Sequence, residues 1–328
     1  MKVKSIILAA LLPLAAQMAL AQSDGDVRNL VLSSEGTPSG LSYGSADTGF
    51  DTGAWISGGL DWDIIPKKLG ISFDEEIRLK DNFSNPNKAY TNAALEFRAL
   101  PWLKAETSYS FILTKNSSDV WKKRHRAAFS LTATARFGRW KLSLREKLQA
   151  TYKDYDVNLS QTPQTDLALK SRLKLSLDLR HSKWEPYVSA EIRNTLNAVN
   201  PASFVYGTYN WQKYSSEDSG WNDKSRICYG NLTPSYNDIY INRLRFIAGT
   251  EWKYSRNQVL DMFLILDCSY DLPVDFSANG IQKSYSSYLE DNPSSKVSEV
   301  NYYKYGVGIL TLKDSYFAGV GLSWRFKL

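Results

Sequence analysis

The stretch RWKLSLREKLQATY, from Arg139 to Tyr152, alternates between two kinds of side chain. Its even positions are mostly apolar, and its odd positions are charged or polar. Successive side chains of a β-strand point to opposite faces, so this alternation gives a strand with one apolar and one polar face. In a helix the same side chains would be scattered around the axis. The stretch therefore predicts a strand, and it leaves Glu146 as an acid on the apolar face.

The same alternation recurs along the rest of the chain. It covers residues 54–64, 69–80, 92–99, 103–113, 127–137, 166–180, 184–194, 240–254, 260–270 and 316–328. Many of these stretches are longer than the five or six residues that are typical, as a rough average, of strands in globular sheets. A tilted strand that crosses a membrane needs about 9–11 residues. The lengths therefore favour strands that span a lipid bilayer over those of a soluble sandwich.

The connections and the tryptophans point the same way. Short connections such as residues 66–68 alternate with longer ones, notably Thr195–Asp238 and Leu272–Val300. Tryptophans gather at membrane–water interfaces, where one part of the ring meets headgroups and the other meets hydrocarbon. A girdle of this kind is predicted near the short turns and the C-terminus, at Trp62, Trp102, Trp140, Trp184, Trp252 and Trp324.

We therefore predict an all-β fold, an antiparallel transmembrane β-barrel of about 12 strands (roughly 10–14), with short periplasmic turns and longer extracellular loops. The barrel is expected over residues 54–328, after a flexible N-terminal segment or plug over residues 22–53. The alternating stretches are odd in number, whereas bacterial barrels have an even number of strands. A further strand is therefore expected.

The N-terminus has the features of a secretory signal peptide. Lys2 and Lys4 precede the apolar run SIILAALLPLAAQMAL, and Ala19-Leu20-Ala21 supplies the small residues of a cleavage site. Residues 1–21 are therefore expected to be removed before Gln22. Together with the barrel pattern, this export signal predicts the outer membrane of a Gram-negative bacterium. Outer-membrane lipid and the barrel-insertion machinery are then the expected partners.

Three stretches resemble a known family. They are SFDEEIRLKDN, KRHRAAFSLTATARFGRWKLSLREKLQATYKDYD and LKSRLKLSLDLRHSKWEPYVSAEIRN. The family consists of uncharacterised bacterial outer-membrane proteins catalogued as domain of unknown function 2490. The resemblance is strongest from about Ala54 to Asn194 and weaker beyond it. It implies a β-barrel in the outer membrane and supplies no activity and no catalytic residues.

The polar faces of the strands are expected to line the barrel lumen and to separate by charge. A basic wall is predicted from Arg124, Arg126, Arg136, Arg139, Lys141, Arg145, Lys147, Lys170, Arg172, Lys174 and Arg180. An acidic wall is predicted from Asp61, Asp63, Asp74, Glu76, Glu96 and Glu106. One interpretation is a narrow water-filled pore whose field favours anions. The other is a ladder of ion pairs that fills a closed barrel.

Enzymatic and metal chemistry has weak support in the sequence. The chain has two histidines, His125 and His181, and neither has a local catalytic partner pattern. They are too few and too scattered for a metal cluster, so no metal and no cofactor are expected. Cys228 and Cys268 either pair or remain free thiols. The net charge of +6 is too mild and too dispersed to indicate nucleic-acid binding.

Two acids, Glu75 and Glu146, have the parity of the apolar face. Either a β-bulge turns them inward, which is the interpretation we favour, or they face a partner subunit or a pocket. The functional prediction is a non-catalytic barrel that passes or binds small anionic or polar solutes. The alternative is a closed structural or adhesive barrel that acts through its aromatic loops, and a lipid-modifying or proteolytic barrel enzyme is third.

Overall fold

The computed structural model describes residues 42–116, 118–157, 162–198, 205–215, 220–230, 236–271, 274–277 and 307–328, and these residues form β-strands joined by turns and loops. The expected signal peptide and residues 22–41 lie outside this part. The strands are β1 (Ser42–Ile65), β2 (Leu69–Lys80), β3 (Asn85–Leu100), β4 (Leu103–Lys115), β5 (Trp121–Phe137), β6 (Trp140–Asp154), β7 (Thr165–Leu177), β8 (Trp184–Ala198), β9 (Val205–Ser215), β10 (Gly220–Gly230), β11 (Asp238–Trp252), β12 (Gln258–Asp271), β13 (Val274–Ser277) and β14 (Val307–Lys327). Within the described residues, no helix has the length and hydropathy to cross a membrane.

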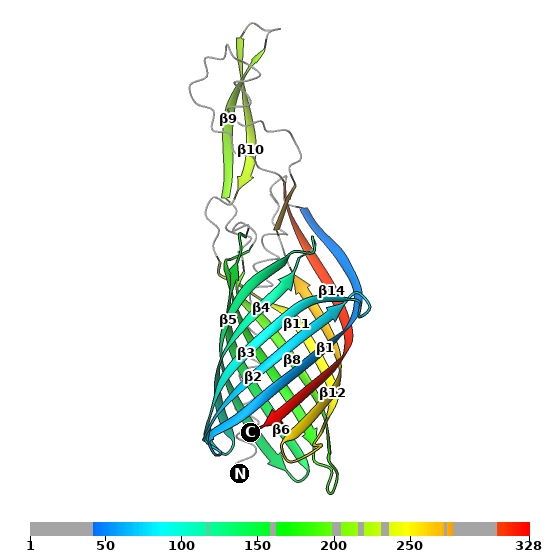
Figure 1. The fold of residues 1–328 in the computed structure, drawn as a ribbon. Helices are drawn as coiled ribbons and strands as arrows, with labels where there is room; N and C mark the ends of the chain where they lie inside the picture. The colour runs from blue at the N-terminus through cyan, green and yellow to red at the C-terminus, as the bar shows by residue number, and fades with distance from the viewer. Residues whose placement is uncertain are drawn as a thin grey trace.

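Eleven of these strands form a closed barrel (Figure 1). From β1 to β8 each strand pairs with the next, and the sheet continues through β11, β12 and β14. The barrel closes because β14 also pairs with β1, in parallel, from Ser42 opposite Ile309 to Asp61 opposite Lys327. The short strand β13 pairs with the start of β14, and β9 pairs with β10 in a separate two-stranded sheet.

The predicted all-β barrel is confirmed, and its strand number lies within the expected range. The additional strand expected from parity is not found among the described residues. An odd number of strands requires one parallel pair, and the β1–β14 pair is parallel. The N-terminal boundary also differs from the prediction, because β1 begins at Ser42 and includes residues 42–53. Small and polar residues in this part of β1 hid the alternation.

The two ends of the barrel differ. At one end, called the turn end, short connections such as residues 66–68 and 138–139 join the strands. At the other, the loop end, the long connections at residues 155–164, 199–237 and 272–306 begin. Trp184 and Trp252 stack at the turn end with ring centroids 5.3 Å apart. Most of the predicted girdle is exposed on the outer surface there, namely Trp62, Trp102, Trp140, Trp184 and Trp324.

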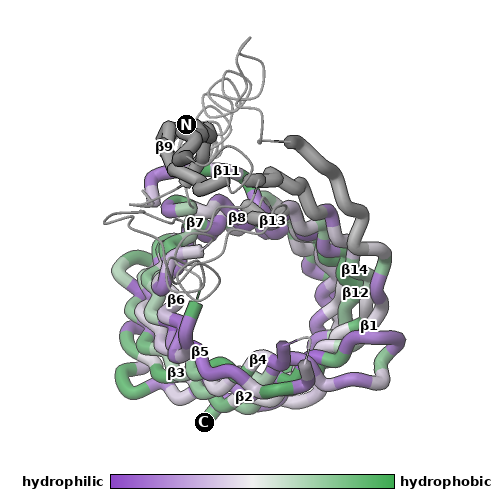
Figure 2. The backbone as a smooth tube through the Cα atoms, turned by 90° about the horizontal axis from the view of Figure 1, so that it is seen from above, coloured by the Kyte–Doolittle hydropathy of each residue, from purple (hydrophilic) through white to green (hydrophobic). Residues whose placement is uncertain are grey.

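The outer surface is apolar and the inner surface is polar. Phe129 and Leu148 sit opposite each other on β5 and β6, and about half of each is exposed on the outside. Their chain neighbours Ser130 and Gln149 point inward and are buried. Figure 2 shows the closed ring along the barrel axis, with hydrophobic and hydrophilic positions alternating around it. The polar face of Arg139–Tyr152 therefore lines the lumen, and the apolar face covers the outside.

Glu75 and Glu146 stay on the outer face, so the β-bulge interpretation is wrong. The β2–β3 register is continuous at Glu75, and both pairings of β6 are continuous at Glu146. Each acid instead accepts a hydrogen bond from a hydroxyl group directly opposite it. Thr91 Oγ1 lies 3.0 Å from Glu75 Oε2, and Ser171 Oγ donates to Glu146 Oε2. These hydrogen bonds reduce the cost of an acid on an apolar face.

Aromatic side chains fill the part of the lumen beside the parallel strand pair. Trp55 of β1 stacks on Phe317 of β14 and meets Phe263 of β12 edge-on. Inward-facing glycines make room for these rings, since a Cβ at Gly321 would lie 2.0 Å from the Phe263 ring. The lumen therefore has an aromatic side at β12, β14 and β1, and an opposite side formed by β5 to β8.

Candidate anion-binding site

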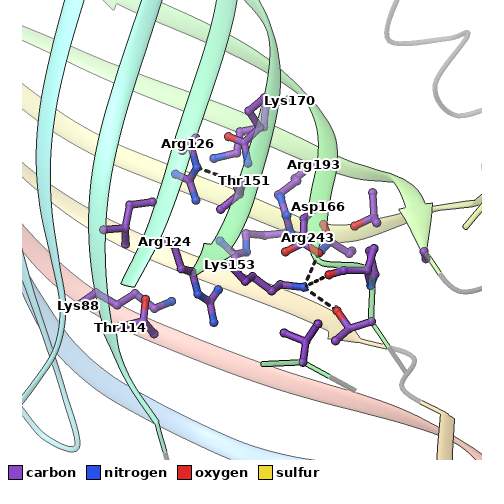
Figure 3. A pocket seen from close by; sticks show the side chains of 18 of the residues that line it. Lys88, Thr114, Arg124, Arg126, Thr151, Lys153, Asp166, Lys170, Arg193 and Arg243 are labelled. Carbon is purple, nitrogen blue, oxygen red and sulfur yellow. Dashed lines mark hydrogen bonds and ion pairs between the residues drawn. The ribbon is translucent and has the colours of Figure 1, made fainter. Parts of the chain in front are cut away.

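A cavity of about 580 Å³ opens in the loop-end half of the lumen. Its volume lies within the range of roughly 300–1,000 Å³ that is usual for ligand sites. Seven strands supply its cationic residues, which are Arg78, Lys88, Arg124, Arg126, Lys153, Lys170, Arg193, Arg243 and Arg245. The acids in its lining are Asp156 and Asp166. Figure 3 shows most of these basic side chains converging from the surrounding strands.

Cations lie directly opposite cations across this part of the sheet. Lys147 on β6 is opposite Lys170 on β7, and Lys170 is opposite Arg193 on β8. Arg193 is in turn opposite Arg243 on β11. All four have inward parity, so they form a row that we call the basic row. Like charges directly opposite on neighbouring strands destabilise a sheet, so this row needs negative charge nearby.

Glu191 of β8 supplies part of that negative charge. Its carboxylate lies 3.5 Å from Arg245, 3.8 Å from Lys170 and 3.9 Å from Arg145. Glu191 is 7% exposed, and Asp267 of β12 continues the network through a 2.6 Å ion pair with Arg245. The network links β6, β7, β8, β11 and β12 across the lumen.

Aromatic rings continue this layer on the other side of the lumen. The guanidinium carbon of Arg78 lies 3.7 Å from the centroid of the Trp55 ring and 4.6 Å from that of Tyr90. Arg245 approaches Trp55 as well, at 4.7 Å. Cation–π contacts of this kind orient a guanidinium group without neutralising it. The rings therefore fix where the guanidinium groups of Arg78 and Arg245 lie, while Glu76 and Asp267 compensate their charge.

Four of the cavity's cations have no acid partner among the described residues. They are Lys88, Arg124, Arg126 and Arg193, and we call them the unpaired cations. The other five make ion pairs with Glu76, Asp166, Glu191 or Asp267. Within the described residues, the acids therefore compensate one part of the cavity's charge and leave a second part uncompensated.

The predicted basic wall is distributed along the length of the barrel. Arg124, Arg126 and Lys170 line the cavity. Lys141, Arg145, Lys147, Arg172 and Lys174 have inward parity and lie closer to the turn end, where Lys174 pairs with Glu251 at 2.6 Å. Arg136 is at the turn end of β5, and Arg139 and Arg180 lie in turns. The residues of the predicted basic wall therefore lie at different positions along the barrel axis and make separate sets of contacts.

The predicted acidic wall does not pair with the predicted basic wall in the described structure. Its ion pairs are local, from Glu76 to Arg78 and from Asp63, Glu96 and Glu106 to Arg98 or Lys104. Asp61 and Asp74 make no ion pair with a described residue. The acids that meet the basic wall come from later strands, and they are Glu185, Glu191 and Glu251.

Parity was the signal that could have identified these later acids. Parity predicts inward side chains on β8 and β11 in the same way as for the predicted basic and acidic walls, and these residues are Glu185, Glu191, Arg193, Arg243 and Arg245. Which residues meet in the lumen depends on strand order and register, and the parity of single strands does not supply that information.

His125 and His181 do not line the cavity. His125 lies on the outer face near the loop end, where its Nδ1 is 2.7 Å from Tyr109 Oη and its Nε2 is 3.8 Å from Asp154. His181 is exposed in a short turn. The described residues contain no group of three metal-ligating side chains. Cys268 is a free thiol on β12, whereas the side chain of Cys228 lies outside the described residues.

The family comparison agrees with the resemblance expected from the sequence. Residues 52–212 match the model of a family described as protein of unknown function, DUF2490. No curated protein matches the chain. The DUF2490 match covers most of β1 and all of β2 to β8, so it includes all four unpaired cations and Glu191. Arg243 and Arg245 lie beyond it.

Proposed function

We propose that this protein is an outer-membrane β-barrel of a Gram-negative bacterium that binds small anionic solutes and passes them through its lumen. The closed sheet leaves no strand edge that would need water, except where β1 and β14 extend beyond it, and its outside is apolar, as a barrel in lipid requires. In this orientation the turn end faces the periplasm and the loop end faces the outside. Its partners are membrane lipid, the barrel-insertion machinery and the solute, and its role is non-catalytic.

The observation that carries the proposal is the basic row. Lys147, Lys170, Arg193 and Arg243 face one another across four neighbouring strands, at roughly 4.8 Å per strand. Such repulsion is reduced when anions enter the lumen. A low-dielectric wall around the lumen also focuses the field and raises the local concentration of anions. Solutes would therefore be selected chiefly by charge.

The experiment is a planar-bilayer recording with a salt gradient across the membrane. The wild-type reversal potential should show a preference for chloride over potassium. The double variant Arg145→Glu, Arg172→Glu reverses the charge of two opposed inward cations and should lower that preference. The control is Arg256→Glu, Lys183→Glu, which changes the same net charge at exposed short turns. In 1 M salt such surface charges are screened within about 3 Å, so the control should keep wild-type selectivity.

Two results would reject parts of this proposal. Absence of conductance at every voltage would reject the passage of solutes. An unchanged reversal potential in the Arg145→Glu, Arg172→Glu variant would remove these residues from the solute path. The variants are compared only after heat-modifiable migration shows that each barrel has folded.

A further inference from the structure

We infer that the loop-end cavity is a binding site for a compact solute that carries at least two negative charges on phosphate oxygens. This inference rests on the proposed function and deepens it, because it names the class of anion and the residues that hold it. The central residues are the unpaired cations Lys88, Arg124, Arg126 and Arg193, together with Thr151.

Charge balance indicates a multivalent ligand. The nine cations of the cavity face five described acids, namely Glu76, Asp156, Asp166, Glu191 and Asp267, so four positive charges remain around one cavity. The four unpaired cations are half-buried in the lumen, where a charge without a partner is unfavourable, and they also repel each other. A monovalent anion would offset one of the four. A ligand with two phosphate groups offsets most of them at once.

The chemistry of the lining favours phosphate oxygens. Three of the four unpaired cations are arginines, whose planar guanidinium group matches phosphate with two parallel hydrogen bonds. Arg126 Nε donates to Thr151 Oγ1 at 3.0 Å, so the O–H of Thr151 can donate to the ligand. Arg124 Nε has no hydrogen-bond partner among the described residues, so it is free to donate to a ligand. These directional donors are more numerous than a carboxylate or a chloride ion can use.

The walls of the cavity limit the size and the route of the ligand. Tyr90 and Ile112 are buried and form an apolar surface beneath the cations. The surrounding strands belong to a closed sheet, so a ligand enters from the loop end and not through the barrel wall. The phosphate groups should therefore belong to a soluble solute, and not to a phosphorylated lipid of the outer leaflet.

The test is calorimetric titration of the full-length protein in detergent micelles. The probes are sodium acetate, inorganic phosphate and pyrophosphate at constant ionic strength, and mixed micelles of a diphosphorylated glycolipid. Pyrophosphate should bind about 10-fold more tightly than phosphate, and acetate should bind least, because the three anions differ in charge and in the number of oxygens that accept charge-assisted hydrogen bonds. Arg126→Gln, Arg193→Gln should weaken pyrophosphate binding about 10- to 100-fold or more. The control Arg256→Gln, Lys183→Gln should bind like the wild type.

Each outcome has a defined meaning. Equal affinity for pyrophosphate and acetate, with anion-selective conductance intact, would overturn the phosphate site and leave the proposed function standing. If the wild-type protein shows equal affinities and also no anion-selective conductance, both the phosphate site and the proposed function are rejected. Binding of the glycolipid alone would overturn a soluble ligand. If the double arginine variant fails to fold, Thr151→Val removes a single donor and should still lower pyrophosphate affinity several-fold, and an unchanged affinity in that variant would overturn the site.

Discussion

Replacing Glu191 by glutamine removes the central negative charge of the lumen network while keeping the shape of the side chain. The carboxylate meets three cations at 3.5–3.9 Å. At an effective dielectric constant of about 20, each of these pairs contributes roughly 4 kcal/mol of Coulomb energy before desolvation is subtracted. Breaking a buried ion pair costs about 3–5 kcal/mol net. Because Lys170 and Arg145 are partly exposed, we expect Glu191→Gln to lower the free energy of unfolding by about 3 kcal/mol.

The assay is equilibrium unfolding in urea with the barrel in detergent micelles, followed by the fluorescence of its ten tryptophans. Glu251→Gln is a matched control, since this half-buried acid has one ion-pair partner among the described residues, Lys174. It should cost about 1 kcal/mol or less. In planar bilayers the same variant should select anions more strongly, because it has lost an inward negative charge. Its stability and its anion preference should therefore change in opposite directions. A loss below about 1 kcal/mol, or a shift toward cations, would refute the network as described.

Two further predictions concern the outer face and the parallel strand pair. Glu146→Leu combined with Ser171→Ala removes the hydrogen-bonded polar pair from the apolar surface, and in lipid vesicles it should raise the free energy of unfolding by about 1 kcal/mol. A lower stability would show that the pair is needed, for example against a partner. Gly53→Ala places a Cβ 1.9 Å from the carbonyl oxygen of Leu79 and should destabilise the barrel by about 1–3 kcal/mol, measured as a lower midpoint of urea unfolding. Gly58→Ala is its control, since its nearest neighbour lies 4.0 Å away, and equal effects of the two changes would contradict this account.

Which side chains face inward could be predicted from the sequence, because strand parity is a local property. Arg124, Arg126 and Lys170 have the parity that brings them into the cavity, and Leu148 has the parity that puts it outside. The same rule placed Glu146 on the apolar face, where the structure has it. Strand parity alone therefore predicts the position of Glu146, because the register there has no bulge.

Three features depended on information that is not local. β1 begins at Ser42 because β14 is long enough to pair with it, and the small residues of this segment gave no alternation. The parallel closure depends on which two edges meet. The pairing of Lys170 with Glu191 depends on the register of β7 against β8. Predicting these features requires the complete arrangement of strands, and a sequence read strand by strand does not supply it.

The pairing of the first strand with the last has a consequence for biogenesis. Ser42 of β1 meets Ile309 of β14, so the edge of β1 has no partner until nearly the whole polypeptide has been delivered. An unsatisfied strand edge recruits other strands, and assembly must therefore shield it during that interval. Every chain truncated before β14 would be an open curved sheet. The basic row could then exist in such a fragment, but no enclosed space around it could.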